Sequence, residues 1–210
     1  MHKKKFFFIV FEGIEGTGKS YQINKLFLNL KKHKIKSIKT REPGGTKTAE
    51  NIRKLIFSKK SKKLDKITDF YLMLAARNEH VSQVILPAKK NNKIVISDRF
   101  VDSTYAYQVA GNNISSKVNS LNQKYITKNI IPDLVIILKS NFNVIKKRLK
   151  ERSHSNKFDK LKKIFYKKVQ RAYIGLSKKN TKRYLVYDSS KNDNYLEKKI
   201  FKEVLFRLNK

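Results

Sequence analysis

The chain has 210 residues and a formal net charge of +34 at pH 7. We expect a single domain over residues 1–210, and the 40% of residues that are hydrophobic are enough for a sizeable core. Because cysteine is absent, disulfides and thiolate zinc sites are excluded. No apolar run reaches the ~18 residues that a membrane span needs, so we expect no membrane association.

The chain alternates between short apolar runs and amphipathic helical patterns. The runs predict strands over residues 6–11, 35–40, 94–97, 133–138 and 184–188. Helical spacing of apolar residues predicts helices over residues 21–34, 51–57, 65–91 and 196–210. Pro87 should kink or break the third of these helices. This order predicts an α/β fold with a five-stranded parallel sheet and helices on both faces.

The stretch GIEGTGKS, residues 13–20, matches the phosphate-binding loop G-x-x-x-x-G-K-[ST] and lies between a predicted strand and a predicted helix. Glycines in such a loop let backbone N–H groups surround a triphosphate, and the helix N-terminus adds its positive dipole end. We expect Lys19 to reach the β- and γ-phosphates and the Ser20 hydroxyl to hold Mg²⁺. The fold class is therefore a P-loop NTPase, and the residues expected to bind ATP are Gly13, Ile14, Glu15, Gly16, Thr17, Gly18, Lys19 and Ser20.

A GTPase is the obvious competitor, because NKFD over residues 156–159 matches the guanine-binding signature N-K-x-D. That signature follows a buried strand, whereas the polar segment KERSHS precedes it here. GTPases also need D-x-x-G for the γ-phosphate switch, and no Asp of this chain has Gly three residues later. The sequence therefore argues against a GTPase.

Two further motifs follow predicted strands and should reach the same edge of the sheet as the phosphate-binding loop. SDRF places Asp98 and Arg99 directly after one strand, and REPGGT, residues 41–46, follows another. Ligands of open α/β sheets bind at the carboxyl ends of the strands. We expect Asp98 to support Mg²⁺, directly or through water, and Arg99 to clamp phosphate with its planar fork of donors.

With these motifs in place, the chain resembles bacterial thymidylate kinases. FEGIEGTGKS, TREPGGT, AARNEH, SDRF and STYAYQ occur here in the order and spacing of that family, over most of the chain. The resemblance implies transfer of the γ-phosphoryl of ATP to dTMP, with Mg²⁺, giving dTDP and ADP. This reaction is a step in dTTP synthesis for DNA replication. The resemblance also implies a cytoplasmic homodimer.

The same resemblance implies roles for individual residues. Arg99 would bridge the acceptor phosphate and the transferred phosphoryl, and Arg77 would hydrogen-bond the thymine edge. Glu15 would meet the deoxyribose 3′-OH or its bound water, and the ring of Tyr107 would leave no room for a ribose 2′-OH. The residues implied to bind dTMP are Glu15, Arg41, Arg53, Met73, Arg77, Arg99, Ser103, Thr104, Tyr107 and Gln108, with Arg41 and Arg53 as candidates for its phosphate.

The chain departs from the family pattern at positions with a chemical consequence. Met73 stands where the family has a Phe stacked on thymine, and methionine packs a ring face more loosely. A short mobile lid is expected over residues 148–163, and there Lys157 replaces an arginine, which is not a neutral exchange. Arg152 or Arg148 is the alternative source of the lid's cation. The expected catalytic residues are Lys19, Arg99, Lys157 and Arg152.

Two other functions stay open on the sequence alone. One is a different small P-loop kinase, acting on another nucleotide or on a small metabolite. The other is a non-catalytic nucleic-acid-binding protein, suggested by the excess of basic residues. Lysine is spread along the whole chain, which favours compositional drift, so we expect no specific nucleic-acid partner.

Overall fold

The computed structural model describes residues 5–58, 64–151, 163–191 and 194–209. Its centre is a five-stranded sheet in the order β2-β3-β1-β4-β5, with every neighbouring pair parallel. The predicted sheet is confirmed, and each strand lies within two residues of its expected position. The strands are β1 (Phe7–Glu12), β2 (Ser37–Arg41), β3 (Ile94–Asp98), β4 (Leu134–Lys139) and β5 (Tyr184–Asp188).

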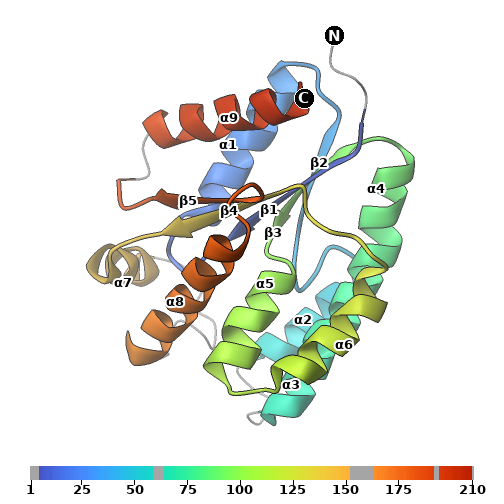
Figure 1. The fold of residues 1–210 in the computed structure, drawn as a ribbon, viewed down its shortest axis with the longest axis vertical. Coiled ribbons are helices and arrows are strands. Elements are labelled where there is room, and N and C mark those ends of the chain that lie inside the picture. Colours follow the sequence, from blue (N-terminus) through green and yellow to red (C-terminus); the bar gives the residue numbers. More distant parts are fainter. Residues whose placement is uncertain (1–4, 59–63, 152–162, 192–193, 210) are drawn as a thin grey trace.

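Helices cover both faces of the sheet, as the alternating pattern predicts. Figure 1 shows α1 and α9 on one face and α5 and α8 on the other, with α2, α3 and α6 further out on that side. The helical elements are α1 (Lys19–Lys32), α2 (Lys47–Phe57), α3 (Lys66–His80), η1 (Val81–Ile85), α4 (Leu86–Lys90), α5 (Val101–Thr104), η2 (Tyr105–Gly111), α6 (Ser116–Thr127), α7 (Phe142–Lys150), α8 (Lys163–Lys179) and α9 (Asn194–Leu208).

The apolar side chains of the strands divide between two cores. Phe8 and Val10 of β1 pack in a core with side chains of η1, η2 and α8, whereas Ile9 and Phe11 pack in a second core with α1 and α9. Successive strand residues point to opposite faces. An unbroken apolar run is therefore what a strand buried on both faces requires.

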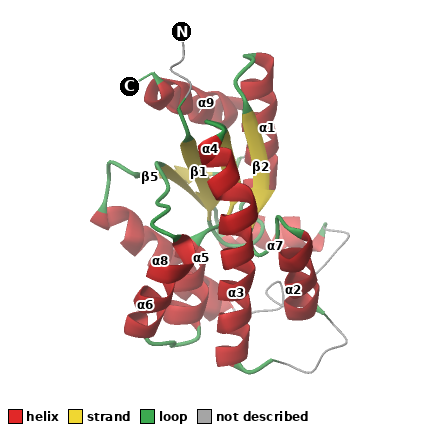
Figure 2. Cartoon of the chain, turned by 90° about the vertical axis from the view of Figure 1, so that its right-hand side faces the viewer, coloured by secondary structure: helices red, strands yellow, loops and turns green. Residues whose placement is uncertain are grey.

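The helical segment that contains Pro87 is not broken. Figure 2 shows α3 continuing through η1 into α4 as one rod. The irregularity comes before the proline, because Val81–Ile85 adopts π-helical hydrogen bonding and Pro87 then lies in the first turn of α4. A missing N–H is best tolerated in a first turn. The π-helical turn before Pro87 therefore lets the helix continue past the proline, where the sequence predicts a kink or a break.

The register of the sheet brings three motifs together. Asp98, at the end of β3, is the partner of Phe11 in β1 and of Arg41 in β2. The phosphate-binding loop, the segment after β2 and the segment after β3 therefore leave the sheet side by side at its carboxyl edge. This is the consequence of parallel pairing that the sequence predicts.

Most of the expected lid lies outside the described residues, including Arg152 and Lys157. Arg148, the other lid candidate, belongs to α7. Within the described part of the chain, no helix has both the length and the apolar character that crossing a membrane would require.

Candidate active site

The phosphate-binding loop joins β1 to α1, and its shape is set by backbone geometry. Gly13, Gly16 and Gly18 all have positive φ angles, of 135°, 76° and 85°, a region that glycine enters without steric cost. A Cβ on Gly13 would lie 2.3 Å from the backbone oxygen of Leu138 in β4. Only glycine can therefore begin the loop this close to the neighbouring strand.

Lys19 folds back over this loop. Its Nζ donates to the backbone oxygens of Gly13, at 2.9 Å, and Ile14, at 3.1 Å. Burial, together with the neighbouring charge of Arg99, lowers the pKa of Lys19 to about 8. A buried ammonium whose hydrogen bonds to the described residues end on carbonyl oxygens is a strong site for an anion, because a bound phosphate would offset the desolvation that lowers this pKa.

Asp98 and Ser20 form a site that suits Mg²⁺. The Ser20 hydroxyl donates to Asp98 Oδ2 over 3.3 Å. The other oxygen, Asp98 Oδ1, is buried and has no hydrogen-bond partner among the described residues. Mg²⁺ is usually held by one or two carboxylates together with substrate phosphates and water. The hydroxyl and the unsatisfied carboxylate oxygen therefore fit this ion.

Arg99 lies at the centre of the site, in a strained backbone conformation. Its φ of 76° is uncommon for any residue other than glycine. Its guanidinium donates to Glu15 at 2.7 Å, Ser103 at 3.0 Å, and the hydroxyls of Tyr173 at 3.1 Å and Tyr107 at 3.4 Å. Non-glycine residues with positive φ are concentrated at functional sites, where the surroundings hold them in place.

Glu15 connects the phosphate-binding loop to η2. One carboxylate oxygen pairs with Arg99, and the other accepts a hydrogen bond from the Tyr107 hydroxyl at 2.5 Å. Tyr107 lies within η2, a π-helical segment, and π-helical turns are frequent at functional sites. The acid that the sequence places inside the loop is therefore buried and paired.

A second wall of the site comes from the segment after β2 and from α2. Arg41 forms a two-pronged ion pair with Glu50, with nitrogen–oxygen distances of 3.1 and 2.8 Å. Arg53 donates to the backbone oxygen of Pro43 at 2.8 Å and lies over the ring of Phe57. Both arginines line the same cleft as the phosphate-binding loop.

Arg77 of α3 is buried and engages a different partner through each of its three nitrogens. Nε pairs with Glu42 at 2.7 Å, Nη1 donates to the Thr104 hydroxyl at 2.8 Å, and Nη2 donates to the Phe100 backbone oxygen at 2.9 Å. A guanidinium has five N–H donors. Two N–H groups therefore remain for a ligand once these hydrogen bonds are made.

A cleft of about 770 Å³ joins these groups. Gly13, Ile14 and Thr17 do not line it and instead shape the loop from behind, as the bond from the Thr17 hydroxyl to the Ile14 oxygen at 2.8 Å illustrates. The predicted residues that line the cleft are Glu15, Gly16, Gly18, Lys19, Ser20, Arg41, Arg53, Met73, Arg77, Asp98, Arg99, Ser103, Thr104, Tyr107 and Gln108.

Arg148 also lines the cleft, but its guanidinium is held by backbone oxygens. It donates to Gly16 at 3.2 Å, Ser189 at 3.0 Å and Ser190 at 2.9 Å. These bonds tie α7 to the phosphate-binding loop and to the segment after β5. Arg148 is thus built into the wall of the site.

Several buried residues of the site escape the sequence analysis. Glu12 accepts hydrogen bonds from the backbone N–H groups of Phe100 and Ser103, at 2.9 and 3.2 Å, and from the Ser103 hydroxyl at 2.7 Å. It thereby anchors the start of α5 beneath Arg99. Its position at the carboxyl end of β1 is the signal that could have identified it. Tyr173 of α8 gives no such signal, because it belongs to none of the motifs in the sequence and meets Arg99 only in the folded chain.

Comparisons with known proteins point to one family. A family model described as thymidylate kinase matches residues 11–200. A thymidylate kinase of Mycoplasma capricolum subsp. capricolum is 40% identical over 203 residues, covering 96% of this chain and 95% of the relative. One of Kosmotoga olearia is 33% identical over 203 residues, covering 97% of each. The crystal structure of a thymidylate kinase from Ehrlichia chaffeensis matches with a TM-score of 0.76 and 27% identity, covering 95% of this chain and 99% of that one.

Glu12 should make stability depend on pH. Burial, together with the neighbouring charge of Asp102, raises the pKa of Glu12 to about 7 from an ordinary value of 4.5. Between these values the unfolded chain has lost the proton that the folded chain keeps, so the free energy of unfolding falls as pH rises from about 5 to 7. In Glu12→Gln this slope should be shallower by up to about 1.4 kcal/mol per pH unit.

Urea unfolding at several pH values measures this slope. Glu197→Gln is the matched control, because it removes a carboxylate of α9 that accepts from Asn29 and does not line the cleft, and it should leave the slope within this window unchanged. Identical slopes for the unmutated protein and Glu12→Gln would show that Glu12 does not hold a proton in the folded state.

Proposed function

Because the chain belongs to the thymidylate kinase family, it phosphorylates dTMP to dTDP, and we propose that the cleft at the carboxyl edge of the sheet binds ATP, Mg²⁺ and dTMP for this reaction. The observation that carries the proposal is the position of Arg99. It lies between Glu15 of the phosphate-binding loop, at 2.7 Å, and Ser103 of α5, at 3.0 Å. A guanidinium at this junction can contact donor and acceptor phosphates together.

The donor side would bind the phosphates of ATP. Backbone N–H groups of the phosphate-binding loop and the N-terminus of α1 face a bound phosphate chain, and Lys19 exchanges its carbonyl partners for phosphate oxygens. Ser20 and Asp98 would hold Mg²⁺, which supplies positive charge to the phosphates when it is bound. Arg148 keeps the loop in place through the Gly16 oxygen.

The acceptor side would bind dTMP with its phosphate toward Arg99, Arg41 and Arg53. Arg77 and Gln108 then read the base, Met73 packs on it, and Ser103 and Thr104 lie near it. Tyr107 and Glu15 contact the sugar. This order of contacts along the cleft is the part of the proposal that follows from the residue-by-residue resemblance.

The chemical step requires alignment and charge neutralisation. An oxygen of the acceptor phosphate forms a bond to the γ-phosphorus, the bond from that phosphorus to the β–γ bridging oxygen breaks, and its electron pair leaves with ADP. Lys19 and Arg99 stabilise the charge that shifts between these oxygens. We assign a further cation to the lid, from Lys157 or Arg152, since the guanidinium of Arg148 is already engaged by backbone oxygens.

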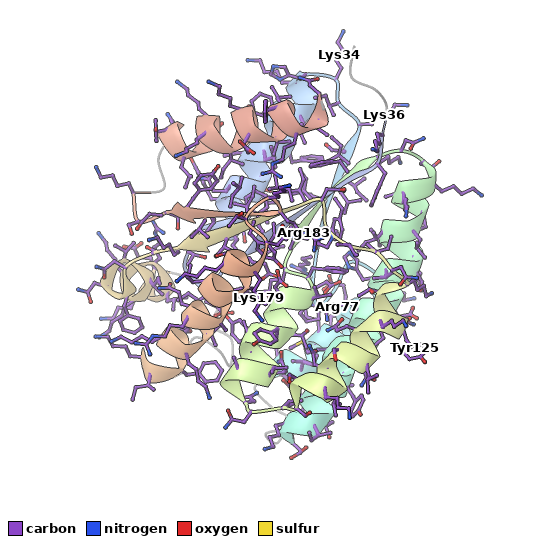
Figure 3. All side chains as sticks on the ribbon, in the orientation of Figure 1. Lys34, Lys36, Arg77, Tyr125, Lys179 and Arg183 are labelled. Atoms are coloured by element: carbon purple, nitrogen blue, oxygen red, sulfur yellow. The ribbon has the colours of Figure 1, made fainter. Side chains whose placement is uncertain are left out.

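The proposal includes a cytoplasmic homodimer. Exposed apolar side chains on two neighbouring helices support a partner surface: Tyr71 on α3 is 50% exposed, and Leu121 and Tyr125 on α6 are 57% and 80% exposed. Figure 3 shows Tyr125 on the outer side of α6. A molar mass in solution equal to that of one 24.7 kDa chain would contradict the dimer.

A coupled assay of ADP release tests the proposed function. Unmutated protein with ATP and Mg²⁺ is given dTMP, dUMP, dCMP or dGMP in turn. We expect the highest kcat/KM with dTMP and no ADP release when Mg²⁺ is removed by chelation. A clear preference for another nucleotide, or release of ADP that no acceptor accelerates, would overturn it.

Tyr107 should select the sugar through its ring and hold Glu15 through its hydroxyl, and two substitutions separate these roles. Tyr107→Phe keeps the ring, so the preference for dTMP over its ribose analogue should persist while kcat falls, because Glu15 loses a hydrogen bond. Tyr107→Ala removes the ring and should relax the preference by about tenfold. The ratio of kcat/KM values for the two acceptors measures this preference, and a change with Tyr107→Phe as large as with Tyr107→Ala would contradict the steric role.

Met73 lines the cleft where a base would stack. Aromatic pairs gain about 0.5–1.5 kcal/mol beyond the burial of area, so Met73→Phe should tighten dTMP binding by about threefold to tenfold. Met73→Leu, which has similar volume and no aromatic ring, is the control and should not tighten it. Calorimetric titration with dTMP gives both affinities, and equal Kd values for Met73→Phe and Met73→Leu would remove stacking as the explanation.

A further inference from the structure

A chain of hydrogen bonds runs through the buried wall of the cleft, from β2 to α3. The Thr40 hydroxyl contacts His80 Nε2 at 2.7 Å, His80 Nδ1 contacts Glu42 Oε1 at 2.8 Å, and Arg77 Nε donates to Glu42 Oε2 at 2.7 Å. The side chains of His80, Glu42 and Arg77 are 0%, 3% and 4% exposed. We refer to Thr40, His80, Glu42 and Arg77 as the His80 network.

Glu42 divides its two carboxylate oxygens between His80 and Arg77. A buried carboxylate is costly unless every oxygen has a partner. Burial opposes ionisation, but the charge of Arg77 and the hydrogen bond from His80 hold the pKa of Glu42 below its ordinary value. Glu42 is thus an anion with one carboxylate oxygen bonded to His80 and the other to Arg77. The bond to His80 fixes the orientation of the carboxylate, and this orientation determines where Glu42 binds Arg77.

His80 also fits tightly against the segment after β2. Gly45 has a φ of +87°, and a Cβ placed on it would lie 2.6 Å from both His80 Cδ2 and Thr40 Oγ1. The imidazole therefore fills the space that a side chain at position 45 would need. Position 45 must therefore be glycine because of His80. His80 does not line the cleft, so this requirement comes from the wall behind the cleft and not from a ligand.

The His80 network joins the two parts of the wall that carry acceptor-site arginines. Arg77 and His80 are three residues apart, so they lie on the same side of α3. Arg41 precedes Glu42, and Arg53 is bonded to Pro43, so the phosphate-side arginines move with the segment that His80 holds. Figure 3 shows Arg77 among the helices below the sheet.

We propose that His80 is a positioning residue for acceptor recognition: through Glu42 and Gly45 it sets the distance and angle between Arg77 on α3 and the phosphate-side segment after β2. This inference rests on the proposed function, which assigns the base to Arg77 and the phosphate to Arg41 and Arg53. His80 touches neither substrate. It fixes the spacing of the groups that read the two ends of dTMP, so a nucleotide whose base presents other polar groups is rejected.

Loss of His80 should change the kinetics with dTMP and not those with ATP. If His80 only stabilised the fold, its loss would lower the melting temperature and leave the kinetics of the folded fraction unchanged. As a positioning residue, its loss lets the guanidinium of Arg77 rotate away from the base. The KM for dTMP then rises, the preference for dTMP over dCMP falls, and the KM for ATP stays the same.

Four variants test the proposal, with kinetics measured well below each melting temperature. His80→Leu removes both ring nitrogens, and we expect the KM for dTMP to rise about tenfold or more, with the KM for ATP within about twofold. His80→Asn can still donate to Glu42 from the position of Nδ1 and should recover most of this loss. Thr40→Val removes the partner of Nε2 and should have an intermediate effect. Ser82→Ala, two residues after His80 and bonded to the Asn78 oxygen, is the control and should behave as unmutated protein.

The proposal is overturned if folded His80→Leu keeps both the KM for dTMP and the preference over dCMP, or if the KM values for dTMP and ATP rise equally. If His80→Leu does not fold, the same KM values and the same preference are measured for Thr40→Val, and unchanged values overturn the proposal. Failure of the proposed function is a separate result, because unmutated protein would then show no preference for dTMP at all.

Discussion

The site depends on one largely buried ion pair, between Arg99 and Glu15, whose side chains are 15% and 8% exposed. A buried pair gains little unless its remaining donors and acceptors are satisfied. Here the hydroxyls of Ser103, Tyr107 and Tyr173 complete the shell. The backbone holds the strained φ of Arg99, because its N–H donates to the Phe11 oxygen and its own oxygen accepts from Ser97. The charged centre is therefore preorganised before any substrate binds, and electrostatic stabilisation of a transition state needs such preorganisation.

The parallel sheet explains why donor and acceptor groups meet at this pair. Parallel strands place their carboxyl ends at one edge, so the ends of β1, β2 and β3 deliver the phosphate-binding loop, the segment from Arg41 and the Asp98–Arg99 pair to one cleft. The acceptor side is then completed by two buried side chains that do not line the cleft, Glu12 and His80. Glu12 holds the start of α5 by accepting hydrogen bonds from Phe100 and Ser103. His80 holds the segment after β2 through its contacts with Glu42 and Gly45.

Much of this arrangement could be predicted from the sequence, and the exceptions have physical reasons. The strands were predictable because runs buried on both faces are continuous, and the phosphate-binding loop because its glycines meet a fixed backbone requirement. Glu42 and His80 were not, because a buried charge and its partner look like ordinary polar residues until the fold brings β2 against α3. Tyr173 reaches Arg99 only because α8 packs on η2. The helical irregularity was expected at Pro87 and lies before it, because π-helical hydrogen bonding has no clear sequence signature. The roles of Lys157 and Arg152 stay predictions, since these residues are outside the described part of the chain.

The central claim is that the planar fork of Arg99, and not its charge alone, joins the two halves of the site. Arg99→Lys tests it most directly, because lysine keeps the positive charge opposite Glu15 but cannot engage several partners from one plane. We predict that kcat/KM for dTMP falls by about a hundredfold or more, while calorimetry shows ADP binding changed by less than about threefold. A folded Arg99→Lys enzyme with kcat/KM for dTMP within about threefold of the unmutated protein would contradict the claim.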